Sequence, residues 1–233
     1  MLAQILMTNG LLEGVMDGGA IYPIWGSFGW VIAIRIRNKA DNTMKTIILW
    51  EGNGYARGHP MDSDRAEPYG RLALFIFVKR YAEFMGIRKS KRIFRTYCDN
   101  SHVIKYDHEE NDPYYSPGTT MKPNWDIYTQ VDAIKKDITT VFEDIKPCIH
   151  IKGHQDNDKD RNKLPWPVQL NCRCDDLATE ILDSYDATEQ DRKYPLQVCK
   201  EYLVCNSTWI TSNPIKYIKD LTNEQPLHAY HKE

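Results

Sequence analysis

The chain has 233 residues, 42% hydrophobic and 27% charged, which is enough for one domain with an appendage or for two small domains. Its formal net charge of −2 excludes a strongly basic nucleic-acid binder, so affinity for nucleic acid would come from local patches or from a partner. The longest apolar run, residues 72–78, is too short to span a bilayer, and we expect no secretory signal. The six cysteines form no C-x-x-C pair and favour thiols in a reducing compartment. We therefore expect an intracellular protein, in cytoplasm or nucleus, without a membrane partner.

Three strands are expected first, after a mildly apolar leader over residues 1–11. The strand predicted at residues 13–20 ends in a glycine-rich turn, which puts Asp17 where a backbone can approach a ligand closely. An ordinary Asp-Gly turn explains the same residues. Residues 26–35 and 46–50 are aromatic and β-branched, which predicts that they complete an antiparallel meander.

A helix predicted over residues 63–84 carries apolar residues on nearly every side, so we expect it to be buried against the sheet. Ser63 is its expected N-cap, and Pro68 is tolerated in the first turn. Glu67 lies in the same turn, where an acid also suits the helix dipole without having any function.

The fourth predicted strand, residues 93–98, delivers Asp99 at its C-terminal end. Ligands usually bind at this end of the strands in an α/β sheet, although an aspartate there can also cap a helix. We expect a short helix to follow. An insertion over residues 105–124, first acidic and then rich in Tyr, Pro and Gly, is expected after it.

A helix from residue 124 to about residue 142 shows one apolar stripe, and residues 148–151 predict the fifth strand. His154 follows this strand closely and precedes a long polar loop, residues 155–170. A mobile histidine near a carboxylate borne by a helix is an arrangement that metal-assisted phosphate chemistry can use.

The last helix of the domain is expected from Asn171 to about residue 185, with the acidic pair Asp175 and Asp176 in its first turn. We place the domain over residues 12–185. A C-terminal extension over residues 186–233 is predicted to contain a short capped amphipathic helix.

Four acids stand at defined places in this order of elements: Asp17, Glu67, Asp99 and Asp175. Each acid alone can be explained by a local structural role, such as a turn or a helix cap. Local structure does not explain equally well why all four occur together. Hard divalent cations such as Mg²⁺ accept several carboxylate oxygens. Two such ions about 4 Å apart can activate a water on one side of a phosphodiester and stabilise the leaving oxygen on the other. Clustered carboxylates would repel one another without the metals.

The motifs around these acids resemble the ribonuclease H type 1 domain over roughly residues 12–185, and the order of elements agrees. The most specific signal is the pair of closing motifs, Lys152-Gly153-His154 and the Asn-x-Arg-Cys-Asp-x-Leu-Ala run that starts at Asn171. The other resembling segments are Asp17-Gly18-Gly19-Ala20, Gly26-Ser27-Phe28-Gly29-Trp30, Ser63-Asp64-Arg65-Ala66-Glu67 and Tyr97-Cys98-Asp99-Asn100-Ser101.

The resemblance implies an α/β, RNase H-like fold with a five-stranded mixed sheet, whose first three strands are antiparallel, flanked by helices and followed by the C-terminal extension. It implies a metal-dependent endonuclease that hydrolyses the RNA strand of RNA–DNA hybrids and leaves 5′-phosphate and 3′-hydroxyl ends. His154 would shuttle a proton or help to release product, and Asp176 would not be a ligand. Two Mg²⁺ or Mn²⁺ ions would be held by Asp17, Glu67, Asp99 and Asp175.

Substrate contacts are implied at Gly18, Gly19 and Asn100, in the minor groove, where 2′-hydroxyls mark the RNA strand. The chain departs from the family pattern in the long loop after His154, in the tail, and in the segment after the fourth strand, which is acidic where several relatives carry a basic, Trp-containing arm. The acidic segment predicts weak intrinsic binding, because phosphate neutralisation drives most nucleic-acid affinity. Retroelement polyproteins tether the nuclease to a reverse transcriptase, so a reverse transcriptase in the same polyprotein is an expected partner beside the hybrid.

Two other functions stay open. A catalytically silent RNase H-like module that binds nucleic acid or a polymerase partner is favoured by the acidic insertion and the near-neutral charge. Another nuclease of the same superfold, an integrase or a proofreading exonuclease, fits less well, because those relatives place their last carboxylate in different sequence surroundings. Divalent-metal binding separates the active nuclease from the silent module.

Overall fold

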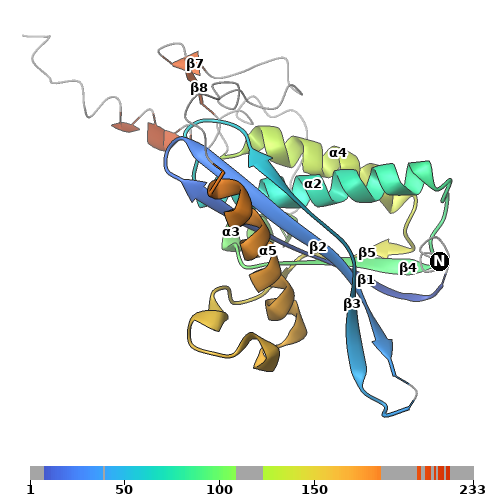
Figure 1. Cartoon of the computed structure of the whole chain (residues 1–233). Coiled ribbons are helices and arrows are strands. Elements are labelled where there is room, and N and C mark those ends of the chain that lie inside the picture. The colour runs from blue at the N-terminus through green and yellow to red at the C-terminus, as the bar shows by residue number, and fades with distance from the viewer. Residues whose placement is uncertain are drawn as a thin grey trace, which may run out of the picture.

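The computed structural model describes residues 8–38, 40–108, 123–184, 204–205, 208–210, 213, 215–217 and 219–220. One mixed sheet has the strand order β3-β2-β1-β4-β5, and β6 also pairs with β4. Helices α2 and α4 lie side by side on one face of the sheet and α5 lies on the other (Figure 1). The strands are β1 (Gly10–Ile21), β2 (Trp25–Arg37), β3 (Met44–Ala56), β4 (Arg92–Cys98), β5 (Asp144–Ile145) and β6 (Ile149–His150), with β7 (Val204–Cys205) and β8 (Thr208–Trp209) in a separate pair. The helices are α2 (Ser63–Phe84), α3 (Ser101–His108), α4 (Trp125–Thr139) and α5 (Trp166–Leu182), with 3₁₀ turns η2 (Gln155–Asn157) and η3 (Arg161–Lys163).

Strand β1 is the centre of the sheet. It pairs antiparallel with β2, which pairs antiparallel with β3, so the predicted meander is confirmed. On its other side β1 runs parallel to β4, with Val15 opposite Tyr97. Asp17 lies two residues after Val15, inside β1, and Asp99 lies two residues after Tyr97, just past β4, so the parallel register brings the two acids side by side.

Side chains that alternate along β1 build a core on each face of the sheet. Leu12 and Met16 pack in the larger core beneath α2, whereas Val15 packs in the smaller one with Cys174 and Leu177 of α5. Helix α2 is buried over most of its first four turns because it lies between the sheet and α4. This confirms the prediction of a central helix.

The fifth strand predicted at residues 148–151 is confirmed by β6, and a short strand that was not predicted, β5, precedes it and also pairs with β4. Pro147 stands between them and has no N–H to donate to a strand ladder. The N–H of Cys148 donates a hydrogen bond to Oδ2 of Asp107 at 2.6 Å and not to a neighbouring strand. Asp107 lies on α3, which extends into the region predicted as an insertion. Asp107 forms a buried ion pair with Arg71 at 2.7 Å, which ties this end of α3 to α2.

Helix α5 begins at Trp166 and not near Asn171, so its predicted start is wrong. Pro167 lies in the first turn, where proline is favoured, and extends the helix back into the predicted polar loop. Asp175 therefore lies in the middle of the helix and not in its first turn.

Helix α2 is capped by Asp62 and not by the expected Ser63. The carboxylate of Asp62 accepts the N–H of Arg65 at 2.9 Å. In the C-terminal extension, most of which lies outside the described residues, Asn213 caps the helical residues 215–217, and its Oδ1 accepts a backbone N–H at 3.1 Å. The predicted division into leader, domain and extension stays a prediction.

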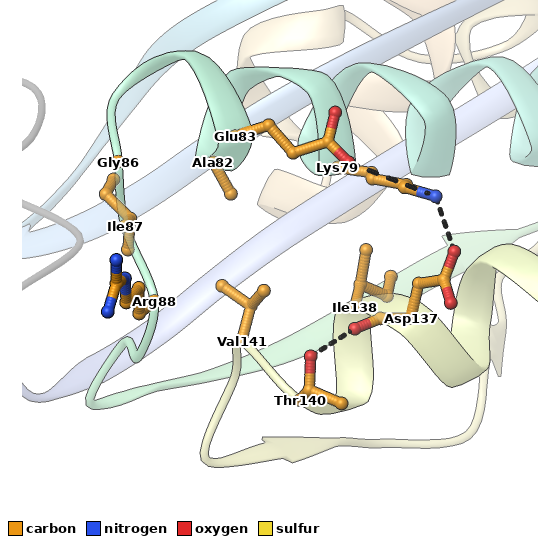
Figure 2. Close-up of a pocket in the computed structure, with 10 residues that line it drawn as sticks. All are labelled: Lys79, Ala82, Glu83, Gly86, Ile87, Arg88, Asp137, Ile138, Thr140 and Val141. Carbon is orange, nitrogen blue, oxygen red and sulfur yellow. Dashed lines mark hydrogen bonds and ion pairs between the residues drawn. The ribbon is translucent and has the colours of Figure 1, made fainter.

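Among the described residues no helix is long and apolar enough to cross a bilayer. A hollow of about 670 Å³ lies between the C-terminal ends of α2 and α4 (Figure 2). Apolar side chains such as Ile87 and Val141 line it, and an ion pair between Lys79 and Asp137 lies at one side. Lys79 follows Glu67 by 12 positions on α2, or about 18 Å at 1.5 Å per residue, so this hollow lies away from the four acids.

Candidate active site

Asp17 and Glu67 meet where β1 passes the first turn of α2. A Cβ on Gly18 would lie 2.5 Å from backbone atoms of Ala66 and Glu67, so glycine is needed for this close approach. The two carboxyls are close enough for the charge of Asp17 to raise the pKa of Glu67. Asp17 Oδ1 accepts the N–H of Gly18 at 2.7 Å, and its Oδ2 accepts Nδ2 of Asn171 at 3.0 Å. The sequence motif contained Asn171, but only the structure assigns it this contact.

Asp99 follows the last residue of β4 and lies beside Asp17 of β1. A Cβ on Gly153 would lie 2.0 Å from Asp99 Oδ2, so the chain that leaves β6 packs directly on this carboxylate. Oδ1 of Asp99 is buried and has no hydrogen-bond partner among the described residues. A buried oxygen without a partner is costly, which makes it an acceptor ready for a ligand.

Asp175 reaches the same site because α5 crosses β2 at Gly29, the residue paired with Asp17. A Cβ on Gly29 would lie 2.2 Å from the carbonyl oxygen of Cys174, which again requires glycine. The hydroxyl of Ser27 donates to a carbonyl of α5 at 2.7 Å and fixes the crossing. All four predicted acids therefore converge on one site.

The pKa values of these carboxyls reflect their crowding. Burial first, and then the charges of Asp99 and Asp175, raises the pKa of Asp17 to about 7. Burial first, and then the charges of Asp17 and Asp99, raises the pKa of Glu67 well above its ordinary value. Burial also raises the pKa of Asp175, and the nearby His154 opposes that increase. Negative charge is unfavourable at this site, and a bound cation would relieve it.

Cys98, the last residue of β4, is a member of the site that sequence reasoning missed. Its Sγ donates to Oε2 of Glu67 at 3.4 Å, and the side chain is fully buried. In the sequence, the position of Cys98 next to Asp99 was the feature that could have indicated this role. Alternation along β4 points it into the core beneath α2, which is the side from which Glu67 approaches.

His154 is exposed and has a φ of 50°, a left-handed conformation uncommon for residues other than glycine. The loop that follows is tied down by Arg161. Its Nε donates to Asp156 Oδ2 at 2.8 Å, and its two terminal nitrogens donate to the Asp176 carboxylate at 2.6 and 2.9 Å. The loop that begins at His154 is therefore held against the turn of α5 that carries Asp175.

The three predicted substrate contacts have different surroundings. The backbones of Gly18 and Gly19 are packed against α2 and α5 respectively. The side chain of Asn100 is engaged within the protein, since its Nδ2 donates to Asp64 at 3.0 Å and its Oδ1 accepts the N–H of His102 at 2.8 Å. Contacts of these residues with a substrate stay predictions.

No family model and no curated protein matches the chain. Solved structures do. LC11-RNase H1, isolated from compost by a metagenomic approach and solved in complex with RNA/DNA hybrid, is 16% identical over 74% of this chain and 97% of that chain, with a TM-score of 0.45. The PFV RNase H domain is 14% identical over 76% of this chain and 96% of that chain, with a TM-score of 0.41. The foamy viral protease-reverse transcriptase in complex with RNA/DNA hybrid is 11% identical over 72% of this chain and 20% of that chain, with a TM-score of 0.37.

The fold is defined by the chain's own topology: antiparallel β1, β2 and β3, a parallel β4 beside β1, and helices on both faces of the sheet. This topology agrees with the α/β, RNase H-like fold that the sequence motifs predicted.

Proposed function

We propose that this chain is a metal-dependent endonuclease that hydrolyses the RNA strand of RNA–DNA hybrids and leaves 5′-phosphate and 3′-hydroxyl ends. One observation carries the proposal: carboxyls from four distant segments converge, and burial raises the pKa of three of them. Such a cluster costs folding free energy, so a function that requires it explains it better than stability does. The acids are Asp17, Glu67, Asp99 and Asp175.

The cluster fits two divalent cations, Mg²⁺ or Mn²⁺. Its donors are carboxylate oxygens, which hard cations prefer, and Asp99 Oδ1 is an acceptor without a partner among the described residues. Asp17, Glu67, Asp99 and Asp175 would hold the ions. Such a pair of ions, when bound, stabilises the charge that develops on the phosphate and promotes ionisation of a water.

Other residues of the chain would orient the metal ligands, transfer a proton and contact the substrate. Asn171 and the N–H of Gly18 each hold one oxygen of Asp17, which fixes the orientation of that carboxylate. His154, exposed at the rim, would carry a proton to or from the reacting phosphate. Gly18, Gly19 and Asn100 would lie along the minor groove, where the 2′-hydroxyls of the RNA strand are displayed.

The proposed partners are the hybrid and a reverse transcriptase in the same polyprotein. The net charge of −2 supports the second, because a nuclease with little net attraction to phosphates gains from being tethered to a protein that already holds the hybrid.

The test is cleavage of a labelled RNA–DNA hybrid in Mg²⁺ and in Mn²⁺ by the wild type and by Asp99→Asn. We expect the substitution to lower kcat more than about 100-fold, because replacing groups that merely orient metal ligands already costs about 10–100-fold. Asp137→Asn, which changes an exposed acid at the far end of α4, should cut like the wild type.

Single-stranded RNA and duplex DNA control for substrate class and should stay intact. A folded wild type that cuts the hybrid in neither metal would contradict the proposal. It would favour the silent module that binds nucleic acid or a polymerase.

Arg161→Gln tests how the histidine loop is held. Exposed ion pairs contribute about 1 kcal/mol or less, so the free energy of unfolding should change little. We expect kcat to fall about tenfold with KM nearly unchanged, because His154 loses its fixed distance from Asp175. Arg161→Lys, which keeps the charge without the bidentate geometry, should recover only part of the rate. If kcat is unchanged at every pH in both variants, catalysis does not depend on the ion pairs by which Arg161 holds this loop.

A further inference from the structure

The acidic site contains a sulfur donor. Cys98 Sγ donates its hydrogen to Glu67 Oε2 at 3.4 Å, and donor atoms of Glu67, Cys98 and Asp99 all lie within 4.8 Å of one another. These donors are two oxygens and one sulfur, whereas a site for Mg²⁺ alone would need only oxygens. Mg²⁺ takes oxygen ligands in octahedral geometry, whereas Zn²⁺ and its heavier analogue Cd²⁺ also accept thiolate.

A second observation points to a ligand at the same place. Asp99 Oδ1 is buried without a hydrogen-bond partner among the described residues, so this oxygen is shielded from water and free to bind. Glu67 is only 5% exposed, so a cation that displaced the Cys98 hydrogen would enter a nearly dry site. Charge interactions between an ion and its ligands are stronger in such surroundings than in water.

We propose that Glu67, Cys98 and Asp99 form a binding site for thiophilic divalent cations, Zn²⁺ or Cd²⁺, whose occupation inhibits the enzyme. The inhibition rests on the proposed function, because the same two carboxylates would hold the catalytic Mg²⁺. On binding, the S–H bond of Cys98 breaks, its proton passes to the buffer, and a sulfur–metal bond forms without any change of oxidation state. Water completes the coordination of the ion.

Cys174 provides a matched control. It is equally buried, but it lies on the opposite face of the sheet, where its Sγ donates to the Val15 carbonyl at 3.3 Å. A serine there keeps a donor for that carbonyl. Cys174→Ser therefore removes a buried thiol without removing one from the proposed site.

The experiment is a titration of metal-free protein with Cd²⁺, followed by the ultraviolet charge-transfer band of a thiolate–cadmium bond and by calorimetry. The wild type and Cys174→Ser should develop the band with the same affinity. Cys98→Ser should lose it, and Cd²⁺ should bind at least tenfold more weakly. Glu67→Gln should weaken binding as well. A wild type without the band, or a band that persists in Cys98→Ser, would overturn the proposal.

Zinc X-ray absorption on the wild type needs no folded variant. One sulfur at about 2.3 Å within an oxygen-rich shell supports the site, and a shell without sulfur overturns it. Neither readout depends on catalysis. If Cd²⁺ binds as expected but Mg²⁺ supports no cleavage, only the proposed function fails. If Mg²⁺ supports cleavage but Cd²⁺ produces no thiolate–cadmium band, only the proposed site for Zn²⁺ or Cd²⁺ fails.

Discussion

At pH 8 and without divalent metal, the Asp17→Asn protein is expected to be more stable than the wild type by about 2–4 kcal/mol, while its hydrolysis of the hybrid is lost. Burial and neighbouring charges raise the pKa of Asp17 from 3.8 to about 7. A tenfold change in the acid dissociation constant between the unfolded and folded protein corresponds to about 1.4 kcal/mol. The same carboxylate that the proposed chemistry requires therefore weakens the metal-free fold.

The sign of this effect follows from proton linkage. A carboxyl with a raised pKa in the folded protein adds stability that is complete below its unfolded pKa of 3.8 and is lost as the pH rises through about 7. Asparagine carries no charge at either pH. The two proteins should therefore differ most at pH 8, less at pH 5, and least below pH 3.8.

Asn171 allows the new amide to be accommodated. Its Nδ2 faces Asp17 Oδ2, and its own Oδ1 is buried without a partner among the described residues. Rotation of the Asn171 amide by 180° would let that oxygen accept a hydrogen bond from the new side chain. Replacement by asparagine is therefore milder than replacement by alanine.

Thermal unfolding at pH 5 and pH 8, with and without Mg²⁺, measures the effect. A gain of 1 kcal/mol raises the Tm of a domain of this size by about 2–4 °C. Mg²⁺ should raise the Tm of the wild type and leave that of Asp17→Asn nearly unchanged. An Asp17→Asn protein that is less stable than the wild type at pH 8 would show that the cluster is not strained.

The four acids and most of the sheet could be predicted because their signals are local. A strand pattern followed by Asp99, or a cap followed by Glu67, is visible within a few residues. The contacts that make these acids a site are long-range. Asn171 and Asp17 are separated by 154 positions, and no local pattern shows that they are bonded.

The errors at element boundaries also have physical causes. The short strand β5 is missing from the prediction. Pro147, which has no N–H to donate, separates it from β6, and Asp107 accepts the N–H of Cys148. The loop predicted over residues 155–170 includes Pro165-Trp166-Pro167, although Pro167 in a first turn favours a helix. In each case a proline lies at the boundary of the element.

Asp126→Asn is expected to lower the free energy of unfolding by about 3–5 kcal/mol, because it leaves a buried arginine charge without its counter-ion. Arg65 and Asp126 are both fully buried and form two hydrogen bonds, at 2.9 and 2.7 Å, that join α2 to α4. Arg65 lies two residues before Glu67, so a looser pair should also displace the acid and slow hydrolysis.

Lys79 and Asp137 supply the matched control, since this ion pair joins the same two helices at their exposed ends (Figure 2). Asp137→Asn makes the same chemical change on the same helix, but both side chains are partly exposed, so we expect a loss below about 1 kcal/mol. Urea unfolding of the two variants gives the comparison directly. Equal losses would mean that the Arg65–Asp126 pair contributes no more than a surface pair, and that the position of Glu67 depends on the close approach of Gly18 alone.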